Sequence, residues 1–328
     1  MARPTEAFAL ILAAAALGAP ARAQTLLPFT IAETGKRYAE LAEAVDAIGE
    51  GEGTIRIAPG RYRGCAVQES GRIAFVAEQR GTAIFDGGIC EGKASLVLRG
   101  LAARVDGLVF TSARVDDGNG AGIRIETGDL IVSYTRFADS QCGILSAADP
   151  NGAISIDHST FAGLGNHADA SGVHSLYIGR YGSLKVTNSR FERGTSGHYL
   201  KSRAARIEVL DSSFDDSRGR ATNYMIDLPN GAVGRISGNM FVNGVGKENY
   251  GTMIAVGAEE RVNSSAGLTI EDNEASLAPG FRWPSAFVGN WSGERIVLRG
   301  NRLAPGIALV ERRRGRWTLL LPGARTPR

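Results

Sequence analysis

The chain has 328 residues, 43 of which are glycine, and a formal net charge of +3. The glycine share is close to twice that of an average globular protein, which indicates a fold with many turns. So small a charge gives no reason to expect binding to nucleic acid or to an anionic membrane. The length fits two average domains or one extended repeat domain.

The first 23 residues have the organisation of a signal peptide. Arg3 is followed by an apolar run from Ala7 to Gly18, and positions 21–23 read Ala-Arg-Ala, an A-x-A cleavage pattern. The run is shorter than the roughly 18 apolar residues of a membrane span, and no later stretch reaches that length. We therefore expect an exported bacterial protein, periplasmic or secreted, with no membrane span. An ordinary apolar N-terminal helix is the alternative.

Residues 24–62 are expected to form an N-terminal cap and the first coil of a repeat fold. Four apolar residues between Leu41 and Ile48 are spaced at i, i+3, i+4 and i+7, which predicts an amphipathic helix. Residues 54–62 then alternate as a half-buried strand and include a Pro-Gly turn. A helix in front of a repeat array would cover the apolar end that stacking leaves open.

From residue 63 to residue 311 the chain repeats a short apolar template. An apolar anchor is preceded by mostly apolar residues five and seven positions earlier, and in most repeats by Ser, Thr or Asn two positions earlier. Intervals of 23 to 27 residues suit a coil of three short strands, and longer intervals indicate an inserted loop. The anchors are Phe110, Phe137, Phe161, Phe191, Phe214, Phe241, Ala275 and Leu303.

Each repeat is one coil that cannot bury its apolar face alone, so stacked coils must share a continuous core. Leucine-rich repeats have a similar period, but their Leu-rich consensus and helical segments are missing. A β-sandwich would not keep one template in register over eight repeats. The pattern predicts an all-β, single-stranded right-handed parallel β-helix with a short N-terminal capping helix. A C-terminal strand and basic tail are expected at 312–328.

The chain resembles the pectin-lyase-like superfamily of bacterial secreted right-handed parallel β-helix proteins. The likeness is carried by the segments 44–48 (AVDAI) and 53–62 (GTIRIAPGRY) and by the Asn/Ser-x-Phe repeats. It covers nearly all of the mature chain. It implies the fold and a carbohydrate ligand, often an acidic polysaccharide, along a groove on one outer sheet. The same scaffold carries lyases, hydrolases, esterases, epimerases and adhesins, so the resemblance implies no single activity.

The cysteines fit this arrangement in part. Cys65 and Cys90 are about one repeat apart, so they are placed to lie on neighbouring coils and to form a disulfide in an oxidising compartment. Cys142 is left over, and buried unpaired thiols are the alternative for all three. The cysteines have no metal-ligand spacing.

The best candidates for chemistry lie on the strand that precedes each template. Aligning these strands on their inward Leu or Ile sends Tyr177, Lys201 and Asp227 outward in one column, on coils about 4.8 Å apart. Tyr199 and Arg203 are expected to flank Lys201 on the same face. A slip of one residue would bury the charged members, which is implausible for Lys and Asp.

These residue types suit β-elimination on a uronate sugar. A cation such as Arg203 neutralises the sugar carboxylate and acidifies the carbon beside it, and a base then removes the proton. Lys201 is the predicted base, and Tyr177 or His174 is the predicted acid for the leaving oxygen. A surface ion-pair ladder on the outer sheet is the alternative interpretation.

Two histidines lie beside this column. His174 and His198 begin successive strands at an interval of 24 residues, so we expect them to stack near a coil corner. Strand parity would turn them inward with the leucines. Each histidine is a candidate catalytic residue. Alternatively, the two together form half of a metal site whose other ligands the sequence does not identify. His167, in the insert 163–172, is placed to reach the groove.

Further candidates extend the predicted groove. Tyr224, Glu259, Arg180 and Arg124 lie on or beside the same set of strands and are predicted to bind substrate. The oxygen-rich turn at 116–119 offers calcium ligands without the full spacing of a calcium loop, so a plain turn is the alternative. No cofactor other than this possible calcium is predicted.

The leading prediction is a monomeric polysaccharide lyase-type enzyme that acts on an acidic, uronate-containing polysaccharide. One alternative is an inverting glycoside hydrolase, for which Asp227 and Glu259 are the available outward carboxyl pair. Another is a non-catalytic glycan-binding or envelope protein. No nucleic acid partner is expected.

Overall fold

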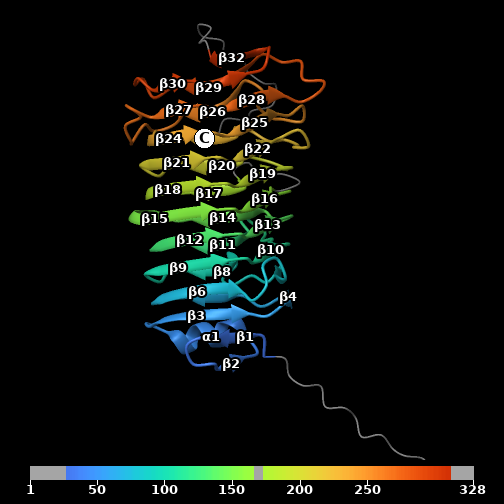
Figure 1. The fold of residues 1–328 in the computed structure, drawn as a ribbon, viewed down its shortest axis with the longest axis vertical. Coiled ribbons are helices and arrows are strands. Elements are labelled where there is room, and N and C mark those ends of the chain that lie inside the picture. Colours follow the sequence, from blue (N-terminus) through green and yellow to red (C-terminus); the bar gives the residue numbers. More distant parts are fainter. Residues whose placement is uncertain (1–26, 166–172, 312–328) are drawn as a thin grey trace, which may run out of the picture.

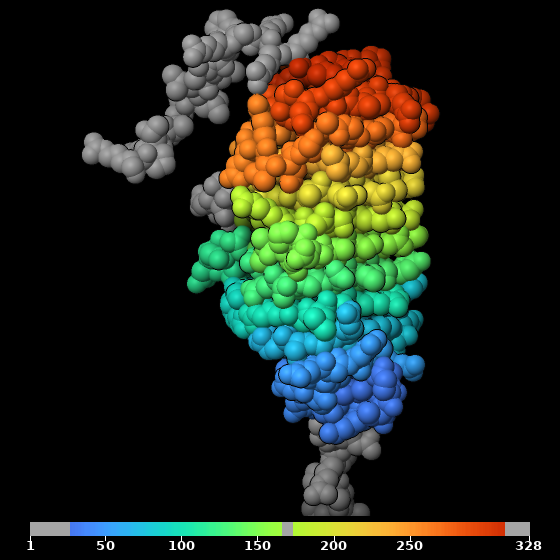
Figure 2. All heavy atoms as spheres, turned by 90° about the vertical axis from the view of Figure 1, so that its left-hand side faces the viewer, coloured from blue at the N-terminus to red at the C-terminus, as the bar shows by residue number. Residues whose placement is uncertain are grey.

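The computed structural model describes residues 27–165 and 173–311; the predicted signal peptide, the tail at 312–328 and His167 lie outside them. The described chain winds into an elongated stack of coils, from the blue N-terminal end to the red end (Figure 1). In the space-filling view the coils follow one another as colour bands along the stack (Figure 2). No described helix is long and apolar enough to cross a membrane.

Three sheets form the walls of the stack, because each coil contributes one strand to each of them. Sheet A contains, in spatial order, β2 (Arg37–Tyr38), β1 (Phe29–Ile31), β3 (Glu52–Ile57), β6 (Arg72–Ala77), β9 (Ala102–Asp106), β12 (Asp129–Ser133), β15 (Asp149–Asp157), β18 (Tyr181–Thr187), β21 (Arg206–Leu210), β24 (Val233–Ser237), β27 (Thr269–Glu271) and β30 (Val297–Arg299). Sheet B contains β4 (Gly60–Tyr62), β7 (Ala83–Asp86), β10 (Val109–Thr111), β13 (Arg136–Ala138), β16 (Thr160–Ala162), β19 (Arg190–Glu192), β22 (Ser213–Asp215), β25 (Met240–Asn243), β28 (Glu274–Leu277) and β31 (Arg302–Leu303). Sheet C contains β5 (Ala66–Gln68), β8 (Ala94–Leu98), β11 (Ala121–Ile125), β14 (Cys142–Ser146), β17 (Leu176–Ile178), β20 (Leu200–Ser202), β23 (Ile226–Leu228), β26 (Thr252–Val256), β29 (Ser285–Asn290) and β32 (Ile307–Val310).

The sheets confirm the architecture predicted from the repeat. From β3 onward every pairing between neighbouring coils is parallel, and only β1 pairs in antiparallel fashion, with β2 and β3. Parallel strands joined by a crossover wind in the right-handed sense. The described residues therefore form a right-handed parallel β-helix.

The repeat anchors form a column inside the stack. They pair in register along sheet B, which places one aromatic ring of each coil directly on the next. Neighbouring rings from Phe110 to Phe241 lie 4.7 to 5.3 Å apart, and each ring is at most 1% exposed. The shared core that single coils could not provide is built on this ladder.

A second ladder runs through the polar residues two positions before the anchors. The backbone N–H of each donates to the side-chain oxygen of its counterpart on the next coil, at 2.9 to 3.3 Å. The residue before it takes a left-handed conformation in most coils, for example at Asn188 and Asp211, both with φ of 49°. Small polar side chains are needed here because this bend leaves amide groups without strand partners. The ladder consists of Thr135, Ser159, Ser189, Ser212, Asn239, Asn273 and Asn301.

Replacing Asn239 by Ala is expected to lower the free energy of unfolding by about 1 to 3 kcal/mol. Its Oδ1 accepts from the Ser212 amide at 2.9 Å and its Nδ2 donates to the Val209 carbonyl at 2.8 Å. Without the Asn239 side chain, the Ser212 amide and the Val209 carbonyl would lose these buried partners. Urea unfolding measures the change. Asn151→Ala is the control, because Asn151 is exposed and a loss within about 0.5 kcal/mol is expected. Equal losses in both variants would contradict a role for the ladder.

The N-terminal helix caps the stack as expected. α1 (Leu41–Ile48) spans the four apolar residues that predicted it and buries Leu41, Ala44 and Val45. A capping box between Glu40 and Glu43 satisfies its first amide groups. The helix contacts β1, β2, β3 and β5, so it covers the apolar end of the first coil.

The structure confirms the disulfide predicted between Cys65 and Cys90. Cys65 and Cys90 form a disulfide between neighbouring coils, with a Cα–Cα distance of 5.5 Å. Cys142 is free and buried, and burial raises the pKa of its thiol to about 12. This thiol therefore stays protonated and unreactive at neutral pH.

Candidate functional site

The predicted outward column is present on sheet C. Tyr177 pairs with Lys201, and Lys201 pairs with Asp227. Asp227 in turn pairs with Ala255. The leucines and isoleucines beside these residues are fully buried in the core. Strand register thus places a phenol, an ammonium and a carboxyl group on three successive coils.

Charged groups converge on Lys201 from both sides. Its Nζ lies 2.8 Å from Glu259 Oε1 and 3.2 Å from Asp227 Oδ2, and its side chain is 11% exposed. The Arg203 guanidinium also binds Glu259. Through its Nε, Arg203 donates to the Tyr177 hydroxyl at 3.0 Å. Tyr177, Lys201, Arg203, Asp227 and Glu259 therefore form one hydrogen-bonded cluster, which we call the sheet C cluster.

Asp227 is the most deeply buried member of the sheet C cluster. Its side chain is 3% exposed, and removal from water raises the pKa of its carboxyl to about 6 against the opposing attraction of the Lys201 ammonium. Its Oδ1 has no hydrogen-bond partner among the described residues. Its Oδ2 faces Lys201 and, at 3.4 Å, His198 Nε2. Asp227 therefore carries a proton in part of the molecules near pH 6.

Glu259 behaves in the opposite way. Its side chain is 40% exposed, and although partial burial raises its pKa, the Lys201 and Arg203 cations outweigh burial and keep it below the usual value. The surroundings thus shift the pKa values of the two carboxyl groups of the cluster in opposite directions.

The histidines stack at the corner beside the column, as expected. The His174 and His198 rings lie 4.7 Å apart, and Tyr224 continues the stack at 5.2 Å from His198. His174 Nδ1 accepts from the backbone N–H of His198 at 3.1 Å, and His198 Nδ1 accepts from that of Tyr224 at 3.0 Å. Because a backbone amide is always the donor, each neutral ring must carry its proton on Nε2.

The electrostatics of the corner keep both rings neutral. Burial, with the nearby Lys201 ammonium acting in the same direction, lowers the pKa of His174 to about 3. Burial also lowers the pKa of His198 well below its usual value, helped by His174 and Lys201. A neutral ring whose Nδ1 is already occupied can donate from Nε2 but has no free nitrogen to act as a base. The geometry therefore favours a hydrogen-bond donor role over proton abstraction.

The predicted outward position of Tyr199 is wrong. Tyr199 was expected on the outer face beside Lys201, but it is 1% exposed, and its hydroxyl donates to Asp216 Oδ1 at 2.7 Å. The strand β20 begins only at Leu200, so the period of two does not extend back to the preceding residues. Tyr199 points into the core. His198, the residue before it, points outward, although strand parity predicted that it would face inward. Tyr199 is excluded as a substrate contact.

A cavity of about 520 Å³ opens in front of these residues. Four cations, Lys93, Arg124, Lys201 and Arg203, and one carboxylate, Asp117, are among the residues that line it. Its wall also includes Gly92, Asn119, Leu145, His174 and Tyr177. The predicted residues Tyr177, Lys201, Arg203, His174 and Arg124 are thus brought to one site. Each of these cations also pairs with a carboxylate beside the cavity, at Glu126, Asp227 or Glu259, so an anionic ligand would compete with those carboxylates.

Other predicted contacts lie outside this cavity wall. Arg180 follows β17 at the far corner, is exposed, and pairs with Glu260 at 2.9 Å. Tyr224 stacks on His198 and lies near Trp291. Asp227 sits beneath Lys201 and His198. These residues support the site or its edges and do not form its wall.

The turn at 116–119 has a structural role. The Asp117 carboxylate accepts from the Asn119 backbone N–H at 2.9 Å, which closes the turn. No group of three or more His, Cys, Asp or Glu that could hold a metal ion occurs in the described ranges. The stacked histidines are therefore not part of such a group among the described residues.

Two contributors were not recognised in the sequence. Lys93 reaches the cavity from a turn close to the Cys65–Cys90 disulfide, a position that has no repeat signature. The indole ring of Trp291 lies so close to Gly289 that a Cβ added to the glycine would come within 2.3 Å of the ring. The sequence did contain a signal for Trp291. The outward column on sheet C continues from Asp227 to the small residues Ala255 and Gly289, which leave space for a ring.

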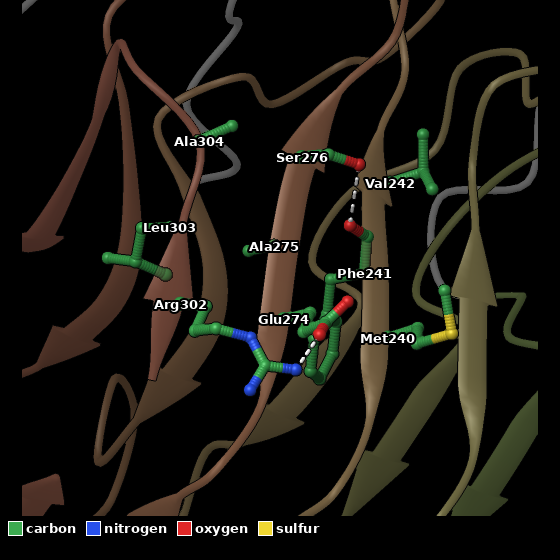
Figure 3. A pocket seen from close by; sticks show the side chains of 9 residues that line it. All are labelled: Met240, Phe241, Val242, Glu274, Ala275, Ser276, Arg302, Leu303 and Ala304. Carbon is green, nitrogen blue, oxygen red and sulfur yellow. Dashed lines mark hydrogen bonds and ion pairs between the residues drawn. The ribbon is translucent and has the colours of Figure 1, made fainter. Parts of the chain in front are cut away.

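A second hollow lies on the outer face of sheet B near the red end (Figure 3). Its charged groups, Glu274 and Arg302, pair with each other, and Ser276 donates to the Phe241 carbonyl. The remaining side chains that line it are apolar, such as Met240 and Leu303. Its charged groups are thus paired within the hollow, whereas Lys201 and Arg203 in the sheet C cavity pair with Glu259, which is 40% exposed.

The chain matches no family model, and none of the curated proteins matches it in sequence. Among solved structures, its fold is similar to that of the pectin methylesterase from Aspergillus niger. The similarity covers 88% of this chain and 87% of that chain, with 10% sequence identity and a TM-score of 0.44.

The stacked histidines predict a pH-dependent stability. Their pKa values are lowered in the folded protein, so the stability they give is complete above the unfolded value of about 6.5 and is lost as the pH falls below it. Each ring contributes a slope of up to about 1.4 kcal/mol per pH unit in that window. Asp227 opposes this, because its raised pKa gives stability that is lost as the pH rises from about 4 to about 6.

Urea unfolding between pH 7.5 and 4.5 measures that slope. The double variant His174→Asn/His198→Asn keeps a hydrogen-bond acceptor near each Nδ1 but removes both titrating groups, so its stability is expected to fall much less with acidification. An identical pH dependence in the wild type and the variant would contradict the neutral, buried state of the rings.

Proposed function

We propose that the protein is an exported carbohydrate-active enzyme that cleaves an acidic, uronate-containing polysaccharide by β-elimination. The observation that carries the proposal is the sheet C cluster, in which a phenol that accepts from an arginine lies beside two cations in a cation-rich cavity. Those groups supply the two requirements of the reaction, a charged site for the sugar carboxylate and a residue that transfers a proton.

Glu259 indicates where the sugar carboxylate would bind. Its own carboxylate bridges Lys201 Nζ and the Arg203 guanidinium, so the two cations are already arranged around one carboxylate. The Glu259 side chain is 40% exposed, which leaves it accessible to competition by a ligand. A uronate carboxylate that replaced it would be neutralised by both cations, and this would acidify the adjacent C5–H bond.

Tyr177 is the residue best placed to move the proton. Its hydroxyl oxygen accepts from Arg203 Nε at 3.0 Å, so the hydroxyl is held beside the cations that would bind the sugar carboxylate. Lys201 was the predicted base, but its Nζ contacts the Asp227 and Glu259 carboxylates, an arrangement that suits a group that binds anions. In the proposed mechanism Lys201 therefore binds the substrate carboxylate together with Arg203.

The proton balance of the reaction closes within the site. The Tyr177 phenolate removes the proton from C5, the C4–O bond to the leaving sugar breaks, and a C4–C5 double bond forms. The same hydroxyl then gives the proton to the leaving oxygen, so no water is consumed. The cation-rich wall formed with Arg124 and Lys93 holds neighbouring acidic sugars of the chain.

The arrangement fits an inverting hydrolase less well. That mechanism needs two carboxyl groups roughly 6.5 to 9.5 Å apart with room for a water between them. Asp227 and Glu259 both contact the same Lys201 Nζ, so the oxygens involved are at most about 6 Å apart. The lysine ammonium occupies the space that the attacking water would need.

The activity is tested by incubating the purified protein with a panel of acidic polysaccharides and recording the ultraviolet absorbance of unsaturated uronates. An absorbance increase with at least one glycan is expected. New reducing ends without absorbance would favour the hydrolase. Binding without any product, from folded protein, would favour a non-catalytic glycan-binding function and would overturn the proposal.

Replacing Glu259 by Gln is expected to lower KM for the acidic substrate about fivefold, because exposed ion pairs of this kind are worth up to about 1 kcal/mol and would no longer compete. Steady-state kinetics at several substrate concentrations measure the change. Glu260→Gln serves as the control, since Glu260 pairs with Arg180 away from the cavity. A rise in KM for Glu259→Gln alone would show that Glu259 assists binding instead.

A further inference from the structure

A second cationic site lies on the turns that lead from sheet B to sheet C. Arg114, Arg193, Arg218 and Arg220 line a hollow of about 240 Å³, together with Asp139, Gly163 and Thr195. None of these residues lines the sheet C cavity. The hollow is a separate feature of the surface.

The four guanidinium groups are only weakly compensated. Arg218 and Arg220 are exposed and form no ion pair with any residue of the described ranges. Arg193 lies 3.8 Å from Glu192, and Arg114 donates to the backbone carbonyl of Asp139 at 3.3 Å. Asp139 is the one carboxylate in the wall. Such an excess of one charge in a hollow attracts counter-ions and anionic ligands.

The turns that carry these arginines are anchored in the interior. Arg193 adopts a left-handed φ of 54°, and the Arg220 amide donates to the Gly194 carbonyl at 2.9 Å. Asp216, close to Arg218, is fully buried and pairs with Lys247 at 3.2 Å. The arginines are therefore displayed from turns whose backbone is held in place, which lowers the entropy lost on binding a ligand.

An aromatic pair lies on the next turns along the same side. Tyr250 and Trp283 stack with ring centroids 3.9 Å apart, and Trp283 is 41% exposed. The turn that contains Tyr250 packs directly on that of Arg220, because the Ala221 amide donates to the Gly246 carbonyl at 2.5 Å. Exposed aromatic faces beside cations suit sugar rings that carry charged groups.

We infer that this face binds a chain of an acidic glycan, through carboxylate or sulfate groups at the arginine hollow and a sugar ring on Trp283. Neighbouring coils are about 4.8 Å apart, which is close to the length of one sugar residue. Arg193 lies on the coil next to that of Arg218 and Arg220, and Arg114 lies three coils before Arg193, so the cations can meet charged groups spaced along a glycan chain. The residues that line the hollow do not line the sheet C cavity, and the inference does not depend on the proposed activity.

Titration calorimetry with short oligosaccharides tests the inference through both affinity and stoichiometry. The probes are a uronate oligosaccharide, a sulfated one, a neutral one of equal length and a single-stranded oligonucleotide. At least one acidic oligosaccharide is expected to bind, and its affinity for this site should fall at least about tenfold in Arg218→Ala/Arg220→Ala. Trp283→Ala should weaken binding as well, and Lys185→Ala, an exposed cation on sheet A, should not.

The stoichiometry separates this site from the sheet C cavity. If both sites bind, the wild type takes up two oligosaccharides, and Arg218→Ala/Arg220→Ala and Arg203→Met each take up one. If only the arginine hollow binds, the wild type takes up one and Arg218→Ala/Arg220→Ala none. Unchanged binding in Arg218→Ala/Arg220→Ala would overturn the inference, as would equal affinity for the neutral oligosaccharide or tighter binding of the oligonucleotide.

Discussion

Replacing Tyr177 by Phe is expected to lower kcat for β-elimination by about 10²- to 10⁴-fold, while the uronate chain still binds. The substitution removes only the hydroxyl that accepts from Arg203 at 3.0 Å, and leaves the cations around the carboxylate site in place. Initial rates from ultraviolet absorbance give kcat, and calorimetry with a uronate oligosaccharide gives the affinity.

The matched control for this substitution is Tyr134→Phe. Tyr134 is 40% exposed and follows β12 of sheet A, away from the cavity, so its loss should leave both rate and affinity unchanged. Full activity in Tyr177→Phe would remove Tyr177 from the chemistry. Loss of binding together with activity would instead assign it to substrate recognition.

Replacing Asp216 by Asn is expected to destabilise the protein by about 3 to 5 kcal/mol. Asp216 and Lys247 form an ion pair in which both side chains are 0% exposed. Burial lowers the pKa of Lys247, and the Asp216 carboxylate acts against this by stabilising the ammonium. Tyr199 and Thr222 can still donate to an amide oxygen at this position, so the substitution isolates the charge. Chemical unfolding measures the loss.

Two comparisons complete that experiment. The double variant Asp216→Asn/Lys247→Met removes both charges and is expected to recover much of the stability, because no buried cation is left alone. Glu208→Gln breaks an exposed pair with Lys185, where both side chains are about half exposed, and should cost less than about 1 kcal/mol. Equal losses for Asp216→Asn and Glu208→Gln would contradict the importance of burial.

Much of the fold was predictable, because the features that define it recur. The phenylalanine anchors and the Ser/Asn positions before them appear once per coil, and the same two positions form the aromatic and polar ladders. The outward column was predictable for the same reason, since strand periodicity decides which side chains point away from the core, but periodicity did not predict that Lys201 and Asp227 are buried there. Tyr177, Lys201 and Asp227 are in register as expected.

The sequence pattern was less informative at corners and inserted turns. Tyr199 lies just before β20, where periodicity does not apply, and the hydrogen bond to Asp216 pulls it inward. The role of Lys201 depends on Glu259, which is 58 residues away and comes from a turn. Lys93 and the arginine hollow also lie on turns. Contacts between turns of different coils depend on the path of each insert, which no repeat position specifies.

The most direct test of the proposed chemistry is the mass of the products formed in water labelled with oxygen-18. Elimination consumes no water, so we expect an unsaturated sugar at the new non-reducing end and no heavy oxygen introduced by cleavage of the bond. The reaction is sampled early, before the reducing ends exchange oxygen with solvent. Saturated products that contain one heavy oxygen per cleaved bond would show hydrolysis and would contradict β-elimination at Tyr177, Lys201 and Arg203.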